Sequence, residues 1–244
     1  MIDKAVSVLD ALLPIAGGLT PTEVATIIET NRSTAFRLLT SLEHAGLLNR
    51  DAESGRYRLG VKLLRYGGAV RAGMSIIKIA EPVLLDLRDE TRQTTLLAMR
   101  EGWGARCLLR LPGPEVDVRS WASGEWLPLH VGAATQALMS AMSDDEVDRY
   151  LTENENWRTA RGERGPDDIR ATVSETRERD WALDEADATP GIASLGTIID
   201  TSPGTPEYAI SVAGLAYHYS GMDLDRTVAK VRAAAADISQ RLRD

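Results

Sequence analysis

The fold of the N-terminal part is decided by residues 31–50, which are NRSTAFRLLTSLEHAGLLNR. The apolar residues of this stretch follow the spacing i, i+3, i+4 and i+7, typical of one buried helical stripe: Ala35, Leu38, Leu39 and Leu42. Asn31 can cap such a helix, and Gly46 ends it. The stretch therefore predicts a helix over residues 31–45 with an apolar inner side and a polar outer side.

The outer side of this helix and its N-terminal turn carry basic and hydroxyl side chains: Arg32, Ser33, Thr34, Arg37 and Ser41. Arginine can bind guanine through two hydrogen bonds, and serine and threonine reach phosphates or base edges. A helix with this outer side is suited to the major groove of DNA. We therefore predict these five residues as DNA contacts.

The segment before this helix predicts two further helices. Apolar spacing indicates one over residues 2–13, which Pro14 and the following glycines end. Thr20-Pro21-Thr22-Glu23 then has the pattern of a capping box with proline at the first helical position. It predicts a short helix over residues 21–29.

The segment after this helix predicts a β-hairpin. Residues 47–50 and 56–59 have strand patterns, and residues 51–55 form the turn between them. Arg56 and Arg58 on the second strand are placed to contact backbone phosphates. The complete order predicts a winged helix-turn-helix DNA-binding domain over residues 1–60.

Charge is divided unevenly along the chain of 244 residues, whose net charge is −8. Residues 1–72 hold nine basic and seven acidic residues, a net of +2, and the remainder carries −10. A basic segment attached to an acidic one favours two functions in two domains. The overall −8 is therefore no argument against a nucleic-acid partner.

The rest of the chain predicts a linker helix and an α+β domain. A helix over residues 61–73, interrupted at Gly67-Gly68, links the two domains. Residues 74–244 alternate helical patterns with strand patterns, which predicts an antiparallel sheet flanked by helices. Within them, residues 115–122 show a strand-like alternation, and residues 202–206 form a turn.

The sequence resembles the IclR-type bacterial transcriptional regulators. The similarity is carried by residues 33–42 (STAFRLLTSL), 45–48 (AGLL) and 55–60 (GRYRLG), and extends through 128–138, 181–184, 190–192 and 209–214. The resemblance implies that the second domain is a GAF-like, effector-binding domain that also mediates oligomerisation. It also implies a set of ligand-pocket residues: Gly132, Ala133, Asp184, Ile192, Ser194, Ser211 and Ala213.

Five residues depart from the family pattern. Ser194 stands where the family often has cysteine, Ile198 where it often has proline, and Gln93 where it usually has glutamate. Thr135-Gln136 replaces the usual Gly-Lys of the buried helix. These changes leave the identity of the ligand open.

Motifs for catalysis and for cofactor binding are absent from the sequence. It has no G-x-S-x-G, P-loop or dinucleotide-binding glycine pattern, and its three histidines stand singly. We therefore expect no catalytic residue, no metal and no cofactor. The alternative interpretation is a metabolic enzyme whose helical N-terminus only dimerises it.

The same sequence predicts a cytoplasmic protein. One cysteine cannot form an intrachain disulfide, no apolar run could span a membrane, and Asp10 interrupts the best candidate for a signal segment, residues 8–18. We expect a DNA-binding regulator, a repressor more than an activator. It would bind double-stranded operator DNA as a homodimer or dimer of dimers, under the control of a small organic acid.

Overall fold

The computed structural model describes residues 1–154, 158–160, 162–185, 188–201 and 206–243. It forms two compact units, Met1–Met74 and Ser75–Asp244, which are described one at a time. Within the described residues, no helix is both long and apolar enough to cross a membrane. Residues 202–205 of the predicted turn lie outside the described residues.

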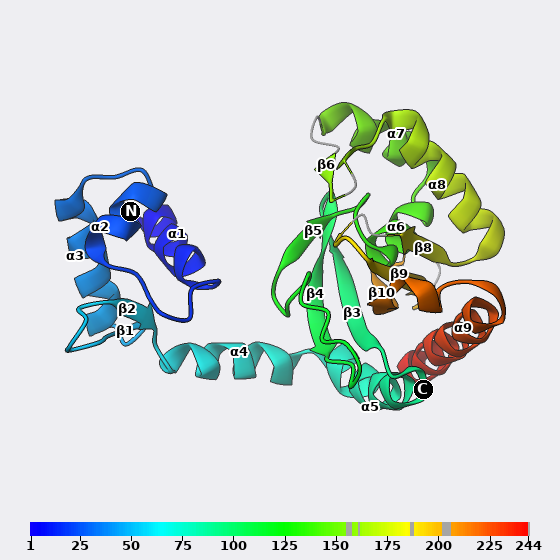
Figure 1. Ribbon diagram of the computed structural model, residues 1–244, viewed down its shortest axis with the longest axis horizontal. Coiled ribbons are helices and arrows are strands. Elements are labelled where there is room, and N and C mark those ends of the chain that lie inside the picture. Colours follow the sequence, from blue (N-terminus) through cyan, green and yellow to red (C-terminus); the bar gives the residue numbers. More distant parts are fainter. Residues whose placement is uncertain (155–157, 161, 186–187, 202–205, 244) are drawn as a thin grey trace. The chain divides into compact units, whose positions relative to one another are not determined.

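The N-terminal unit contains the predicted three helices and hairpin (Figure 1). Its elements are α1 (Ile2–Leu12), α2 (Pro21–Ile27), α3 (Arg32–His44) and the antiparallel strands β1 (Leu48–Arg50) and β2 (Tyr57–Leu59). The capping box between Thr20 and Glu23 starts α2, and the Asn31 side chain accepts from the Thr34 N–H at 2.8 Å to start α3. The winged helix-turn-helix is confirmed.

The core of this unit is the leucine stripe of α3 packed against α1, α2 and the hairpin. Leu39 and Val24 have no exposed surface, and Tyr57 of β2 is almost fully buried. Leu19 and Tyr57 also exchange two backbone hydrogen bonds, which fix the loop before α2 to the hairpin. Burial of this stripe leaves the polar side of α3 in solvent.

Helix α4 (Lys62–Gly73) is continuous, so the predicted interruption at Gly67-Gly68 is wrong. Glycine inside a helix costs about 1 kcal/mol relative to alanine, which weakens a helix without breaking it. None of the residues of α4 is buried.

The C-terminal unit is built on one antiparallel sheet of six strands, which confirms the α+β prediction. The strand order is β5-β4-β3-β10-β9-β8. The strands are β3 (Thr94–Glu101), β4 (Gly104–Leu111), β5 (Trp126–Pro128), β8 (Ala182–Glu185), β9 (Ile192–Ile199) and β10 (Tyr208–Leu215).

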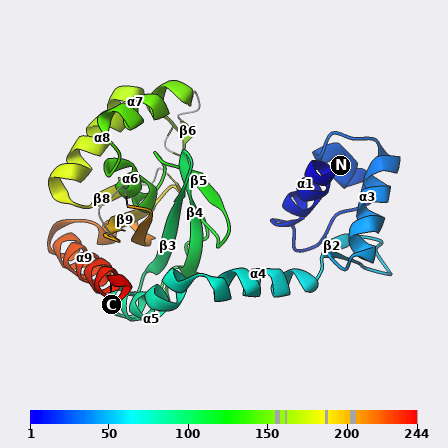
Figure 2. The same cartoon turned by 180° about the vertical axis from the view of Figure 1, so that it is seen from behind.

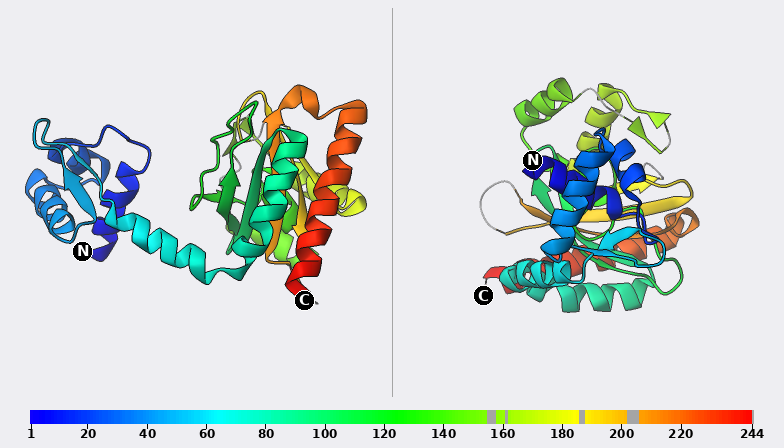
Figure 3. Two further views of the ribbon diagram at one scale, coloured as in Figure 1. Left: turned by 90° about the horizontal axis from the view of Figure 1, so that it is seen from below. Right: turned by 90° about the vertical axis from the view of Figure 1, so that its left-hand side faces the viewer.

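Helices cover both faces of this sheet. On one face, α5 (Ser75–Thr91) and α9 (Gly221–Arg243) lie side by side (Figure 3, left). On the other face, α6 (Ala133–Ser140) lies directly on the sheet, with α8 (Pro166–Arg179) and α7 (Asp144–Glu153) outside it (Figure 2). Successive residues of a strand point to opposite faces of the sheet. The Thr95 hydroxyl bonds to the Leu84 carbonyl of α5 on one face. Leu96 packs in the same core cluster as Leu138 of α6 on the other face.

Small elements complete the unit. They are the hairpin of β6 (Arg158–Thr159) and β7 (Gly162–Glu163) and the 3₁₀ helix η1 (Ala216–His218). Two short edge strands, β5 and β8, were not predicted from the sequence.

Residues 115–122 do not form the predicted strand. The Thr94 hydroxyl holds this segment: it donates to the Val116 carbonyl at 3.0 Å and accepts from the Val118 N–H at 3.2 Å. A side chain therefore satisfies backbone groups that a strand ladder would otherwise pair. Val116 and Val118 alternate with polar residues because both pack against the core cluster, although the segment makes no strand pairing.

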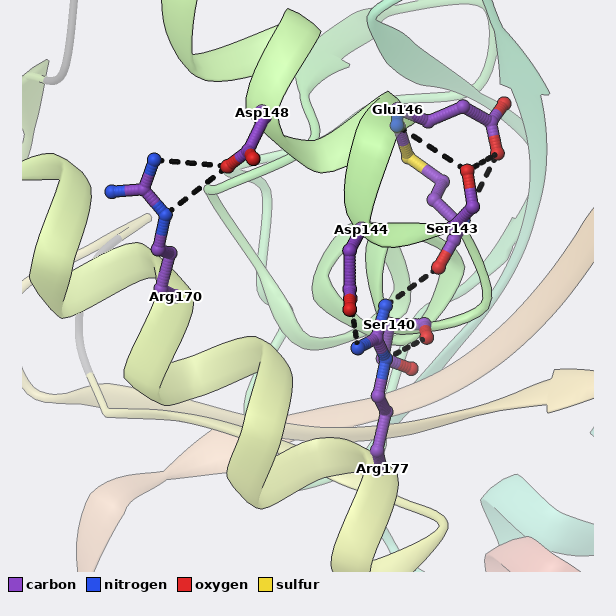
Figure 4. Close-up of polar contacts among 8 residues, drawn as sticks. Ser140, Ser143, Asp144, Glu146, Asp148, Arg170 and Arg177 are labelled. Atoms are coloured by element: carbon purple, nitrogen blue, oxygen red, sulfur yellow. Dashed lines mark hydrogen bonds and ion pairs between the residues drawn. The ribbon is translucent and has the colours of Figure 1, made fainter.

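Two arginines of α8 connect it to α7 and to the end of α6 (Figure 4). Arg170 pairs with Asp148 at 2.9 Å, and Arg177 pairs with Asp144 at 2.7 Å. Arg177 also donates to the backbone carbonyls of Ser140 and Met142. These contacts fix the C-terminal end of α6, whose opposite end borders the pocket described below.

Candidate DNA-binding surface and ligand pocket

The outer side of α3 holds all five DNA contacts that were predicted on this helix. Arg32, Ser33, Arg37 and Ser41 are exposed, and Thr34 is half-buried. Among the described residues, no ion pair or hydrogen bond engages the guanidinium group of Arg32 or Arg37. Both groups are therefore available to an external anion or base.

An open groove runs between the start of α3, the start of α2 and the hairpin. Its volume is about 1340 Å³ with the open mouth included. Its lining is Thr20, Pro21, Thr22, Arg32, Ser33, Phe36, Arg50, Ser54 and Gly55. Most of this lining consists of hydroxyl groups and two arginines, which are side chains that bind the phosphate backbone of DNA.

Sequence reasoning missed Phe36 and Arg50 in this groove. Phe36 was named only as part of the family motif. An apolar residue outside the buried stripe of α3 was the signal that could have identified it. Arg50 is the last residue of the first strand of the hairpin. Its positive charge next to the turn could have indicated a contact with DNA.

The hairpin arginines differ in environment. Arg56 lies at the turn end of the hairpin, directly before β2, where it binds the Glu23 carboxylate at 3.1 Å and donates to the Gly18 carbonyl at 2.8 Å. Arg58 is exposed, and its only recorded hydrogen bond among the described residues is a long one, 3.4 Å, to the Gly17 carbonyl. Arg56 thus has an internal structural role, and its phosphate contact stays a prediction.

Glu23 is the carboxylate on which these contacts converge. The Thr20 N–H donates to it at 2.7 Å, and Arg56 donates from the other side. The Thr20 backbone hydrogen bond, followed by the Thr20 side chain and Arg56, holds the pKa of Glu23 below its ordinary value. The charged form of Glu23 therefore stabilises the unit.

A pocket in the C-terminal unit lies at the N-terminal end of α6, against the sheet. Its volume is about 370 Å³ with the open mouth included. It is lined by Leu96, Val118, Ser120, Trp121, Leu127, Gly132, Ala133, Ala134, Ala188, Ser194, Ser211 and Ala213. Five of the seven residues implied by the family resemblance therefore meet here.

The other two implied residues, Asp184 and Ile192, do not belong to the lining. Asp184 is 2% exposed and pairs with Ser194 across the neighbouring strands β8 and β9. Ile192 packs against the core cluster. Trp121 was missed because its segment was expected to be a strand, whereas it is an irregular loop that reaches the pocket.

The N-terminal end of α6 is held by specific hydrogen bonds. The Ala133 N–H donates to the Ser194 hydroxyl at 3.2 Å. The Thr135 hydroxyl bonds to the Val131 carbonyl, and the Gln136 amide donates to the His130 carbonyl at 3.2 Å. Three of the residues that depart from the family pattern thus fix the turn in front of this helix.

Cys107, His130 and Tyr150 are buried side chains of the C-terminal unit whose chemistry a catalytic site could use. Burial raises the pKa of the Cys107 thiol to about 12, which keeps it neutral. His130 bonds through Nδ1 to the Tyr150 hydroxyl at 2.6 Å, and burial raises the pKa of Tyr150 to about 12. Across the described ranges, no three His, Cys, Asp or Glu residues form a group that could hold a metal.

Comparison with known families identifies both units. Residues 1–52 match the IclR helix-turn-helix domain, and residues 69–240 match the domain described as "Bacterial transcriptional regulator IclR C-terminal". The chain belongs to the IclR family. It is a transcriptional regulator, and the enzyme alternative is set aside because its relatives are regulators.

Individual IclR relatives align along most of the chain. The regulator KipR of Bacillus subtilis is 27% identical over 225 residues, 92% of this chain and 90% of KipR. The transcriptional repressor IclR of Escherichia coli is 22% identical over 216 residues, with 87% and 79% covered. An IclR homologue from Microbacterium hydrocarbonoxydans, solved with 4-hydroxybenzoate, superposes with a TM-score of 0.82 at 20% identity, covering 99% and 98%. At 20% identity, the similarity to this solved structure shows only that the two proteins share a fold.

Proposed function

We propose that this regulator is a cytoplasmic repressor that binds a near-palindromic operator as a homodimer and responds to a small organic acid. The observation that carries the proposal is the exposed outer side of α3. It presents Arg32, Ser33 and Arg37 without internal partners among the described residues, beside a groove lined by hydroxyl and guanidinium groups. Insertion of this side into the major groove would satisfy these groups.

Dimerisation is supported by α4. Leu63, Tyr66 and Val70 share one side of this helix by their spacing, yet Tyr66 and Val70 are mostly exposed. A twelve-residue helix with three glycines and no buried residue is marginal in water on its own. A second copy packed on this side would stabilise it. Two copies would place their α3 helices in successive major grooves, about 34 Å apart.

An organic acid suits the pocket at α6. The first N–H groups of a helix have no intrahelical acceptor and attract carboxylates. The Ser211 hydroxyl, 3% exposed, adds a donor, while Leu96, Val118 and Trp121 supply an apolar wall. This combination favours a compact acid with an apolar body. The IclR homologue from Microbacterium hydrocarbonoxydans was solved in complex with 4-hydroxybenzoate, which is an acid of this kind.

The DNA-binding part of the proposal is tested by gel shift with the DNA upstream of the protein's own gene, over a range of salt. We expect a specific complex whose log K falls with log salt at a slope of about −5 to −7, as for six to eight phosphate contacts. Absence of any specific shift at low salt would refute operator binding.

The dimer is tested by light scattering of two charge variants of α4. Val70→Asp places a carboxylate on the apolar side, and Ala72→Asp places the same charge on the opposite side. Both residues are exposed within the chain, so both variants should fold. We expect Val70→Asp alone to shift the protein towards monomers. Equal masses for both variants would exclude this face as the dimer contact.

The effector part is tested by thermal shift with small carboxylic acids and their neutral amides. Acids should stabilise the wild type more than the amides do, because the amide carries no charge for the helix end. Ser211→Ala should weaken the response, and Ser140→Ala, at the far end of α6, should not. If the amides stabilise the protein as well as the acids, the acid assignment is wrong.

A further inference from the structure

Phe36 is an apolar residue on the polar, exposed side of α3. It is the only phenylalanine of the chain and is 47% exposed, whereas the other apolar residues of α3 are buried. A ring kept in water gives up the free energy that burial would provide. Its position on the polar side of α3 leaves the ring accessible to a binding partner.

The ring lies in the groove between α3, α2 and the hairpin. Ser33 and Arg32, three and four residues earlier, are its neighbours on the helix surface, and Arg50 lines the same groove. A groove with two arginines and several hydroxyl groups is complementary to a polyanion. An apolar protein partner would have to desolvate these charges, so DNA is the favoured occupant.

On the base edges of the major groove, the ring has one suitable target. Phenylalanine can neither donate to phosphates nor accept from base amines. The major-groove edge of a base pair offers one apolar group, the C5-methyl of thymine. Phe36 precedes Arg37 and lies one turn after Ser33, so its ring reaches base edges when those side chains do.

We propose that Phe36 is a specificity-determining residue that contacts a thymine methyl group in each operator half-site. The proposal rests on the proposed operator binding. It adds a sequence requirement: each half-site contains a thymine near the base that Arg37 contacts. A base with hydrogen in place of the methyl group leaves the ring partly in water and binds less tightly.

Uracil substitution tests the proposal, because uracil differs from thymine only by the methyl group. The full-length protein first selects an operator from random-sequence duplexes. Each thymine of that operator is then replaced by uracil, and the dissociation constants are measured by fluorescence anisotropy. We expect one position per half-site at which uracil weakens wild-type binding about fourfold, the loss for one buried methyl group.

The variant Phe36→Ala should bind the thymine duplex more weakly and should no longer distinguish thymine from uracil at that position. Phe36→Leu, which keeps an apolar side chain, should retain part of the discrimination. Ile27→Ala is the matched control: Ile27 is 50% exposed on α2 but does not line the groove. Its thymine-to-uracil ratio should equal that of the wild type.

The outcomes separate this proposal from operator binding itself. An operator without thymine, or equal affinity for thymine and uracil at every position, overturns the role of Phe36 and leaves operator binding intact. Weaker binding by Phe36→Ala with an unchanged thymine-to-uracil ratio also overturns it, since the ring would then act on the backbone or as a wedge. Failure to select any duplex refutes operator binding.

Discussion

Glu23 and Arg56, 33 residues apart in sequence, face each other as a doubly hydrogen-bonded pair. Their atoms are 3.1 Å (Nη1 to Oε2) and 3.2 Å (Nη2 to Oε1) apart. Because Glu23 also accepts from the N–H of Thr20, one carboxylate connects the start of α2 to the hairpin. This pair adds a side-chain link to the Leu19–Tyr57 backbone hydrogen bonds that join the same loop to the hairpin.

The pair predicts an acid-sensitive DNA-binding unit. The pKa of Glu23 is below its ordinary value of 4.5, so its contribution is complete at neutral pH and is lost as pH falls through the folded-state pKa. Glu23→Gln should lower protection against hydrogen exchange in α2 and the hairpin at pH 7. The difference from wild type should shrink below about pH 4.5. A difference that stays constant down to pH 3 would contradict this assignment.

The helix cap of α2 predicts a second stability effect. Thr20→Ala removes the hydroxyl that accepts from the Glu23 N–H, and loss of such a cap typically costs about 1 kcal/mol. Thr22→Ala, two residues later and exposed, removes no recorded hydrogen bond of its side chain. Hydrogen exchange of α2 should separate the two variants. Equal protection in both would show that the cap is energetically unimportant.

Gly196 of β9 predicts an effect on the ligand pocket. A Cβ atom at this position would lie 2.8 Å from backbone atoms of Ala133 and Ala134, so Gly196→Ala forces α6 away from the sheet. We expect a loss of about 1–3 kcal/mol in unfolding free energy, typical of overpacking, together with weaker acid binding. Gly17→Ala, which meets no atom within 4 Å, is the control. Unchanged acid binding in Gly196→Ala would show that the pocket does not depend on this contact.

We expect the thiol of Cys107 to react slowly with thiol reagents in the folded protein. Burial raises the pKa of this only cysteine to about 12 from 9.0, so the folded state favours the neutral thiol and loses that contribution only as pH rises from 9 towards 12. The native protein should react with a disulfide reagent at pH 8 far more slowly than the urea-unfolded protein. Immediate stoichiometric labelling of the native protein would contradict the burial of this side chain.

The N-terminal unit could be predicted from sequence because its determinants are local. The Thr20–Glu23 capping box, the Asn31 cap and the leucine stripe each lie within a few residues, and all three were confirmed. The Arg56–Glu23 pair was missed because sequence spacing does not indicate which of the exposed charges meet in space.

The C-terminal unit was less predictable because its determinants are long-range. β8 and β5 have only three or four residues and depend on pairing with β9 and β4. The segment of residues 115–122 alternates like a strand, yet its backbone bonds at two points to the hydroxyl of Thr94, more than twenty residues away in sequence. The pocket residues Ser194 and Ser211 were placed by family resemblance, while Trp121 came from a loop that no local pattern describes.

Recognition of operator bases by the outer side of α3 is tested by the variant Arg37→Ala. The dissociation constants of wild type and variant are measured on the selected operator and on a scrambled duplex at one salt concentration, with Arg149→Ala, on the C-terminal unit, as the control. We expect Arg37→Ala to lose about 1–3 kcal/mol of binding free energy on the operator and to change little on the scrambled duplex. Wild-type affinity of Arg37→Ala for the operator would contradict recognition by this side of α3.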